Sequence, residues 1–438
     1  MFKDAKKPEI LSPAGNFEKL RSAILFGADA VYFAGKNFGM RAAADNFTLE
    51  EIEQACLYAH AKGKKLYLTV NTVPRSGDID NLLVYLKEIK NMRGRPDALI
   101  CADIGVMTLV KKVLPEVDIH VSTQANTQNH PACGAWAALG AKRVILSREL
   151  SFGDIRCIRD NLSADIELEC FVHGAMCVSY SGRCLISNYL TSRDANKGAC
   201  AQPCRWHYYL SEEKRPDLFL EAAEQPASGV AAGVLARPHE FDLDLESGGQ
   251  AGTFLFSSKD LCMIEHMGDL VESGVSSFKI EGRMKSAYYA ACITNAYRTA
   301  LDIFYETGKI SPELMRSLKR ETESVSRREY DTGYFYGAPE TDAKICEKPD
   351  YIREKIYLGL CVGYERETSL AVFEQRNKIM RNQRVEVLSP GSFGRGACAD
   401  ILLDEKNEPV ESAPRPFMIF KIHTDFAVSP GDILRSAD

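Results

Sequence analysis

The sequence of 438 residues contains no apolar run that approaches the roughly 18 residues of a membrane-spanning helix. The first ten residues, MFKDAKKPEI, are partly basic, but no apolar segment follows them, so a secretory signal peptide is not expected. We therefore expect a cytoplasmic protein without a membrane partner. The H-E-x-x-H motif of zinc peptidases and the G-x-S-x-G motif of serine hydrolases are also missing, which disfavours both classes of hydrolase.

The chain also has little excess of charge of either sign. The chain has 54 basic and 60 acidic residues, and residues 211–250 alone account for the net charge of −6. That segment is rich in alanine and glycine, and we expect an acidic surface flap there rather than catalytic machinery. Because the rest of the chain is neutral overall, its composition does not exclude a nucleic-acid partner.

Seven short apolar segments alternate with helix-like segments between residues 8 and 172. Such nearly continuous apolar segments are typical of strands buried on both faces, and their spacing suits βαβ units of a parallel sheet. An eighth strand is predicted at Ser276–Glu281, after a helical segment at Ser258–Ser273. This order predicts an α/β fold with a (β/α)8 TIM-like barrel, although periodicity alone leaves a doubly wound sheet open. The earlier strands are predicted at Glu9–Ser12, Ala30–Ala34, Lys65–Asn71, Ala98–Ala102, Ile119–Ser122, Arg143–Ser147 and Ile166–Val172.

The barrel is predicted to occupy residues 1–309. A gap of about 100 residues before its eighth strand forms a cysteine-rich insertion after strand seven, with a loop at 173–206 and the acidic flap at 211–250. This insertion leaves the barrel at the face that carries the active site in barrel enzymes. Residues 310–345 are predicted to be a linker. Residues 346–438 show short alternating strands with turn residues and are predicted to form a small C-terminal β-barrel domain.

Fourteen cysteines are many for a chain expected in the cytoplasm, where disulfides are rare. Four of them follow the pattern C-x6-C-x15-C-x3-C, namely Cys177, Cys184, Cys200 and Cys204. Four thiolates in one glycine-containing loop suit zinc or an iron–sulfur cluster, and spacing wider than C-x2-C favours a 4Fe-4S cluster. A set of free or buried cysteines is the alternative. Four cysteine ligands would leave no iron open, which favours an electron-transfer or structural role.

Several longer motifs resemble the collagenase-like proteins filed as peptidase family U32, a family of unassigned catalytic type. They are FVHGAMCVSYSGRCLIS, GACAQPCRW, SSKDL and SFKIEGRMKSAYY, together with EILSPAGN, GADAVYFAG and HVSTQAN. The resemblance covers roughly residues 8–438 and is strongest to the tRNA hydroxylation proteins of that family. One departure is the segment between Trp206 and Ser257, which is longer than the resemblance leads us to expect.

The resemblance implies an enzyme that hydroxylates the wobble uridine of tRNA to 5-hydroxyuridine, with prephenate as a required metabolite. It also implies a 4Fe-4S cluster on the same four cysteines, and it allows a partner subunit of the same family. The alternatives are a hydroxylase of another RNA or of a small aromatic compound, a cluster-dependent RNA-binding scaffold, and a collagenase-like peptidase. A cysteine peptidase needs a thiolate paired with histidine, and these thiols are expected to be committed to metal.

Polar residues at the C-terminal ends of barrel strands are candidates for the site, because those ends meet at one face. Arginine binds carboxylates through two hydrogen bonds, so a small dicarboxylate metabolite is expected to contact arginines there. The substrate-binding candidates are Arg148, Arg283, Gln124, Asn71 and Arg41. The catalytic candidates are His173, Glu281 and Lys279, of which His173 could relay a proton. Helix caps, a structural histidine and a salt-bridge network that closes the barrel are the alternatives.

A run of four basic residues in the predicted C-terminal domain is the candidate RNA contact. Arg376, Lys378, Arg381 and Arg384 lie within nine residues. Such a basic hairpin could hold phosphates while the barrel addresses one flipped-out base. A solvated surface is the alternative interpretation.

Overall fold

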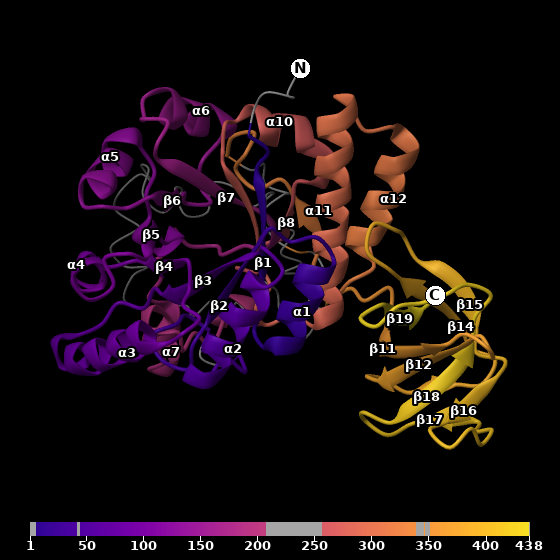
Figure 1. Cartoon of the computed structure of the whole chain (residues 1–438). Helices are drawn as coiled ribbons and strands as arrows, with labels where there is room; N and C mark the ends of the chain where they lie inside the picture. The colour runs from indigo at the N-terminus through magenta and orange to yellow at the C-terminus, as the bar shows by residue number, and fades with distance from the viewer. Residues whose placement is uncertain (1–5, 42–43, 207–255, 339–345, 347–350, 438) are drawn as a thin grey trace, which may run out of the picture.

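Eight short parallel strands close into a barrel in the computed structural model, which describes residues 6–41, 44–206, 256–338, 346 and 351–437 (Figure 1). The eighth strand of the barrel pairs with both the seventh and the first, so the eight parallel strands form a closed ring. The predicted (β/α)8 TIM-like barrel is therefore confirmed, and the doubly wound alternative is wrong. The strands are β1 Glu9–Pro13, β2 Ala30–Ala34, β3 Lys65–Val70, β4 Ala98–Cys101, β5 Asp118–Val121, β6 Arg143–Ile145, β7 Glu167–Ala175 and β9 Ser277–Ile280.

Helices cover the outside of the barrel, and polar residues in the preceding connections start them. Asn16, Asp103 and Ser151 each accept a hydrogen bond from a backbone N–H of the following first turn. The buried apolar side chains of these helices and of the strands form one hydrophobic core. The helices are α1 Phe17–Leu25, α2 Leu49–His60, α3 Ile79–Asn91, α4 Ile104–Val113, α5 His130–Ala138, α6 Phe152–Asp160, α10 Met267–Glu272 and α11 Ala287–Thr307. Within the described residues, no helix combines the length and apolarity needed to cross a bilayer.

A charged layer lies inside the barrel. Arg143 donates to Glu9 at 2.7 Å and to Glu169 at 2.9 Å, and Lys279 donates to Glu169 at 2.7 Å. Glu169 is completely buried. Buried charges are tolerated only when they are paired, so these contacts join β1, β6, β7 and β9 into one arrangement.

The prediction of a helix at Ser258–Ser273 is wrong for the first half of that segment. Residues Asp260–Cys262 form β8, which runs antiparallel to the end of β7 and also pairs with β10 Tyr330–Asp331. The Asp260 carboxylate accepts hydrogen bonds from the backbone and the guanidinium of Arg328. Long-range strand pairing has thus overridden a local helical pattern, and α10 begins only at Met267.

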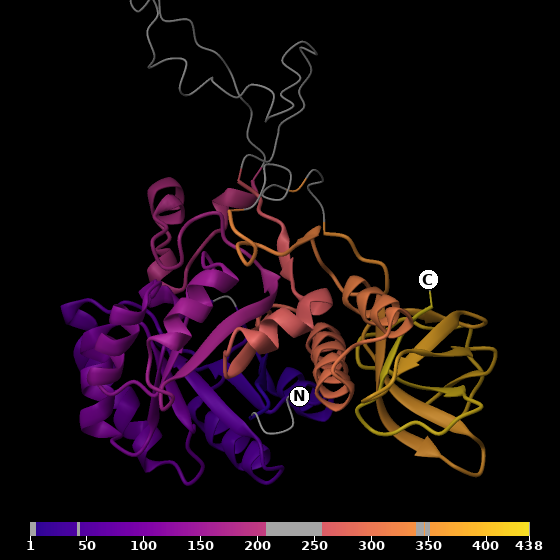
Figure 2. The same cartoon turned by 90° about the horizontal axis from the view of Figure 1, so that it is seen from above.

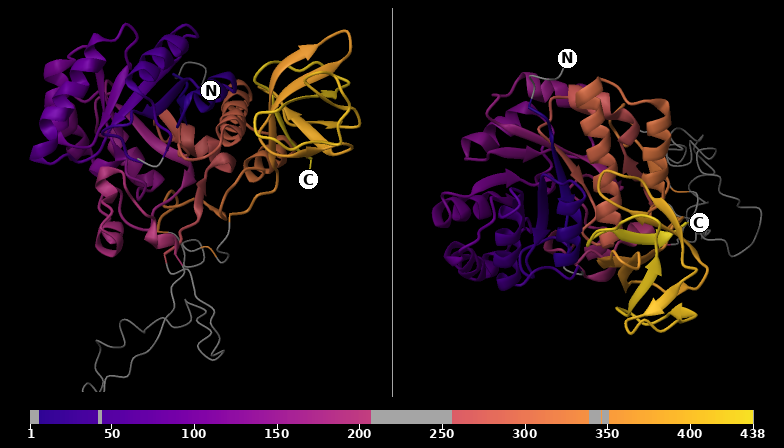
Figure 3. Two further views of the ribbon diagram at one scale, coloured as in Figure 1. Left: turned by 90° about the horizontal axis from the view of Figure 1, so that it is seen from below. Right: turned by 45° about the vertical axis from the view of Figure 1, so that its right-hand side comes forward.

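The C-terminal domain is an antiparallel half-barrel with its own core (Figures 1 and 3). Its sheet has the order β15-β14-β19-β11-β12-β18-β16, which leaves β15 and β16 as edges among the described strands. The predicted small β domain is confirmed. Its sheet is an open half-barrel and not a closed barrel. Its strands are β11 Tyr357–Glu365, β12 Leu370–Gln375, β13 Ile379–Met380, β14 Arg384–Leu388, β15 Arg395–Cys398, β16 Leu402–Asp404, β17 Ser412–Ala413, β18 Ile419–His423 and β19 Ile433–Ser436.

The segment expected to be a linker contains regular structure that packs on the barrel. Helix α12 Pro312–Glu323 packs against α11, and the two helices lie between the barrel and the half-barrel (Figure 2). Arg435 of β19 makes a buried, two-pronged ion pair with Glu321 of α12, at 2.6 and 2.7 Å. Asn295 of α11 adds hydrogen bonds to Gly391 and Ser392. These contacts hold the half-barrel against one side of the barrel.

We predict that Glu321→Ala lowers the free energy of unfolding by about 3–5 kcal/mol, because it leaves Arg435 buried with part of its charge uncompensated. Urea denaturation followed by circular dichroism measures this change. The control is Glu411→Ala, which breaks the exposed pair with Arg381 and should cost less than about 1 kcal/mol. Equal losses in the two variants would show that the buried pair does not hold the domains together.

Candidate functional site

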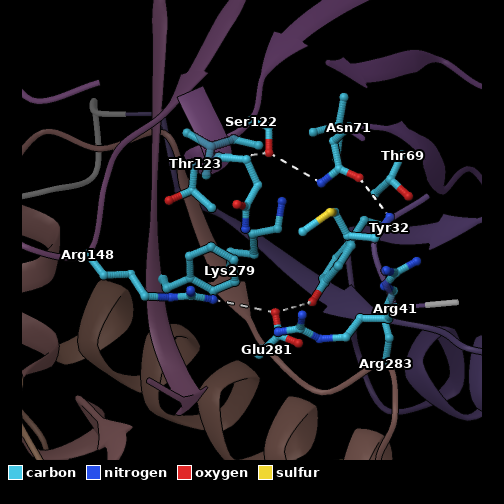
Figure 4. A pocket seen from close by; sticks show the side chains of 15 residues that line it. Tyr32, Arg41, Thr69, Asn71, Ser122, Thr123, Arg148, Lys279, Glu281 and Arg283 are labelled. Atoms are coloured by element: carbon cyan, nitrogen blue, oxygen red, sulfur yellow. Dashed lines mark hydrogen bonds and ion pairs between the residues drawn. The ribbon is translucent and has the colours of Figure 1, made fainter. Parts of the chain in front are cut away.

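A pocket opens where the barrel strands end, and polar side chains line it (Figure 4). Seven of the predicted site residues meet there, namely Arg41, Asn71, Gln124, Arg148, Lys279, Glu281 and Arg283. Lys279 lies in β9 and the other six lie in connections that follow strands around the barrel, and the closed ring of strands brings them together. Residues that the sequence did not single out complete the lining, namely Tyr32, Met40, Thr69, Ile100, Ser122, Thr123, Ile145 and Phe171.

Glu281 is the only acidic side chain of the pocket lining among the described residues. Arg148 reaches its carboxylate at 3.5 Å, and the Tyr32 hydroxyl donates to it at 3.4 Å (Figure 4). Burial acts to raise the pKa of Glu281, but Arg41, Arg148 and Arg283 outweigh burial and hold the pKa below its usual range. Glu281 is therefore ionised at neutral pH and cannot act as a general acid there.

Two of the pocket arginines have buried N–H groups that the described residues leave without a hydrogen-bond partner. They are Nη1 of Arg283 and Nε of Arg148. Burial also lowers the pKa of Arg283 to about 10. Buried donors almost always have partners, so these two groups point to an anionic ligand. Three guanidinium groups face a single carboxylate here, which leaves an excess of two positive charges.

Lys279 is tied to the charged layer inside the barrel. Its ammonium group donates to Glu169 at 2.7 Å and lies 4.4 Å from the centre of the Tyr32 ring. Burial lowers its pKa, although Glu169 acts in the opposite direction. Because Glu169 neutralises it, Lys279 adds little to the net charge of the pocket.

The loop at residues 173–206, which we call the cysteine loop, lies directly over the pocket lining. Gly182, with φ of +74°, packs so closely on Gln124 that a Cβ atom would collide with the Gln124 carbonyl oxygen. Gly198, with φ of +83°, lies against Gly39, where a Cβ would come within 2.8 Å of the carbonyl oxygen. Both positions therefore require glycine. They fasten the loop to the connections that supply Gln124 and Arg41.

The four thiols lie close enough to affect one another. Burial raises the pKa of Cys204, and the charges of Cys177, Cys200 and Cys184 raise it further. Soft thiols on one loop are the correct donors for zinc or an iron–sulfur cluster. Within the described residues, however, no three histidine, cysteine or acidic side chains are gathered into a formed metal site. The donor set fits such a group, and the cluster stays a prediction.

Arg41 connects the thiols with the pocket. It lines the pocket, and its backbone has the left-handed φ of +74°, which is uncommon for a residue other than glycine. Burial acts to lower its pKa, but the charges of Glu281, Cys177 and Cys200 raise it. One guanidinium group therefore interacts with both the pocket carboxylate and the cysteine loop.

His173, predicted as a proton relay, does not line the pocket. It is buried among tyrosines, with Nε2 3.2 Å from the Tyr330 hydroxyl and Nδ1 3.4 Å from the Tyr297 hydroxyl. The pairing of β7 with β9 shifts register between Phe171 and His173, so Phe171 faces the pocket while His173 faces away. Burial lowers the pKa of His173 to about 3, which keeps it neutral. The position of His173 therefore fits a structural histidine, which was the alternative to a proton relay.

The basic run of the C-terminal domain lies away from the pocket. Arg376 makes ion pairs with Glu374 and with Glu18 of α1, so it connects the half-barrel to the barrel. Arg381 pairs with Glu411. Lys378 and Arg384 are exposed. The structure therefore assigns Arg376 a domain contact and leaves the other three on the surface.

A sequence model of peptidase family U32 matches residues 15–344, and a model of the C-terminal domain of that family matches residues 353–435. The chain belongs to peptidase family U32. It is 34% identical over 435 residues to tRNA hydroxylation protein P1 of Bacillus subtilis, covering 98% of this chain and 95% of that one. It is 36% identical over 402 residues to tRNA hydroxylation protein P of Escherichia coli, covering 88% and 86%. The 23S rRNA 5-hydroxycytidine C2501 synthase of Escherichia coli is 33% identical over 360 residues, covering 81% and 48%. The whole U32 chain is thus similar to proteins named for RNA hydroxylation.

We predict that His173→Gln flattens the loss of stability on acidification. The unfolded chain binds a proton at a histidine with a pKa of about 6.5, whereas the folded chain does not until about pH 3, so stability falls as the pH drops below about 6.5. The wild type should lose up to about 1.4 kcal/mol more per pH unit than the variant. Urea denaturation at several pH values between 7 and 4 measures the difference.

The control is His423→Gln, at a partly exposed histidine of β18, which should keep the pH dependence of the wild type. If an NMR titration instead gives His173 a pKa near its ordinary value, the histidine is open to solvent and its structural assignment is wrong.

Proposed function

We propose that the protein hydroxylates the wobble uridine of tRNA to 5-hydroxyuridine. Two facts support the proposal. The chain is similar over nearly its whole length to two proteins named for tRNA hydroxylation. The pocket at the barrel mouth holds three arginines around one carboxylate, with unpartnered donors on two of them among the described residues. This cationic pocket is the observation that carries the proposal.

The small-molecule ligand of the pocket is a dicarboxylate, and prephenate is the one that the family resemblance implies. The excess of two positive charges matches two carboxylates in number. Arg148 and Arg283 are placed to hold one carboxylate each, because each has a buried N–H group that remains to be satisfied. Glu281, kept ionised, holds the guanidinium groups in place while the ligand is absent.

The uracil base would enter beside the ligand. Asn71 and Ser122 hydrogen-bond to each other at 3.3 Å and present polar groups to the pocket, and Gln124 lies next to them in the lining. Phe171 and Ile145 supply apolar surface. Enzymes that modify a base take it out of its stack into such a pocket. The barrel mouth would therefore orient the base and exclude water from it.

A 4Fe-4S cluster is proposed on Cys177, Cys184, Cys200 and Cys204. When bound, it supplies one-electron transfer close to the pocket. The residues of the chain do the rest: Gly182 and Gly198 allow the loop to lie on the pocket, and Arg41 supplies a positive charge that acts on both the thiolates and Glu281. A peptidase based on His173 and a thiolate is not supported, because His173 is buried among tyrosines.

We predict that tRNA from cells lacking this protein loses 5-hydroxyuridine and the nucleosides made from it. Wild-type protein should restore them, whereas Arg148→Ala and Cys200→Ser should restore less than about a tenth. The arginine variant loses a ligand contact, and the cysteine variant loses a cluster ligand. Mass spectrometry of nucleosides from purified tRNA and rRNA measures the outcome, and the control that should restore fully is Arg93→Ala, at an exposed residue outside the pocket lining.

Loss of a hydroxylated nucleoside from rRNA alone would assign the enzyme to another RNA. Unchanged nucleosides in both RNA pools would contradict an RNA hydroxylase altogether. Full restoration by Arg148→Ala would show that the pocket does not take part in the hydroxylation.

A further inference from the structure

The cysteine loop exposes an unusual number of large apolar side chains. Tyr189 is 88% exposed, Leu185 66% and Tyr180 60%. Leu190, Val178 and Trp206 are also exposed. We call these six exposed side chains of the cysteine loop the aromatic face. Concentrations of exposed apolar surface usually mark a binding site, since they are costly to leave in water.

Helix α7, Ile186–Thr191, is turned with its apolar side outward. Its buried side chain is Ser187, whose hydroxyl donates to the Arg193 carbonyl at 2.8 Å and accepts the Ala201 N–H at 2.9 Å. Tyr189 and Leu190 point to solvent instead. A surface helix normally buries its apolar side. The hydrogen bonds of Ser187 hold this opposite orientation, so the exposure of Tyr189 is built into the fold.

The charge of the same loop favours an anionic partner. Between residues 178 and 206 there are four basic residues, and Asp194 is the sole acidic one. Lys197 is paired with Asp78, and Arg205 donates to Tyr351. Arg183 and Arg193 are exposed beside the aromatic face. Aromatic rings combined with arginines are the usual means of holding single-stranded nucleic acid, through base stacking and phosphate contacts.

The aromatic face adjoins the site. Gly182, between Tyr180 and Leu185, rests on Gln124 of the pocket lining. Tyr334 lines a cavity of about 160 Å³ with Met176, Cys177 and Val178. A nucleotide held on the face would be at the entrance to the reaction site.

We propose that the aromatic face of the cysteine loop is the docking surface for a single-stranded segment of the RNA substrate. Bases stack on Tyr180 and Tyr189, and Arg183 and Arg193 hold the adjoining phosphates. The loop therefore has two tasks, because it carries the thiols and also positions the RNA. This inference rests on the proposed function, since it requires an RNA substrate.

The test is fluorescence anisotropy of a labelled anticodon stem–loop RNA with the full-length protein, purified anaerobically. The double variant Tyr180→Ala/Tyr189→Ala should bind about tenfold or more weakly, because each stacking contact is lost. Phe417→Ala is the matched control, since Phe417 is 65% exposed on the half-barrel, and it should leave the Kd within about twofold. Arg183→Gln should reduce the slope of log Kd against log salt concentration by about 0.7.

Unchanged binding by the double variant, with wild-type protein that binds RNA, would overturn the docking surface and leave the proposed function intact. If the double variant also loses self-association in sedimentation velocity, the face is a protein contact and the inference is wrong. Wild-type protein that neither binds RNA nor alters nucleosides in cells would overturn the proposed function and this inference together.

Discussion

Glu281 stays ionised although it is buried, because Arg41, Arg148 and Arg283 surround it. A carboxylate in this position neutralises one guanidinium group and leaves two that still need an anion. The barrel makes this arrangement stable, since Glu9 and Glu169 compensate Arg143 and Lys279 in the charged layer beneath the pocket. The unsatisfied charge is thereby concentrated at the mouth, where a ligand can reach it.

Arg41 links the cysteine loop with the pocket. Burial acts to lower the pKa of Arg41, but the charges of Glu281, Cys177 and Cys200 raise it. The close approach of Gly198 to Gly39 holds the cysteine loop against the segment that carries Arg41. Ligand binding in the pocket and metal binding by the thiols should therefore influence each other electrostatically, since both place negative charge near one guanidinium group.

The barrel could be predicted because strands buried on both faces give apolar runs that recur with the βα spacing. Arg148, Arg283 and Glu281 followed from the rule that the ends of parallel strands meet at one face. Tyr32 was missed, because a strand buried on both faces shows no alternation that marks its inner side. His173 was misplaced by a register shift that leaves no trace in the sequence. The contact of Arg376 with the barrel could not be foreseen, because its partner Glu18 lies 358 residues away. Strand β8 was missed because its pairing is long-range as well.

The proposed reaction requires that the four thiols hold a redox-active cluster next to the cationic pocket. The most direct measurement is the iron and sulfide content and the visible absorption spectrum of anaerobically purified wild-type protein, beside Cys200→Ser. We expect about four irons per chain with a broad absorption near 400 nm, both lost in the variant. Colourless wild-type protein that carries zinc, or no metal, would contradict this expectation.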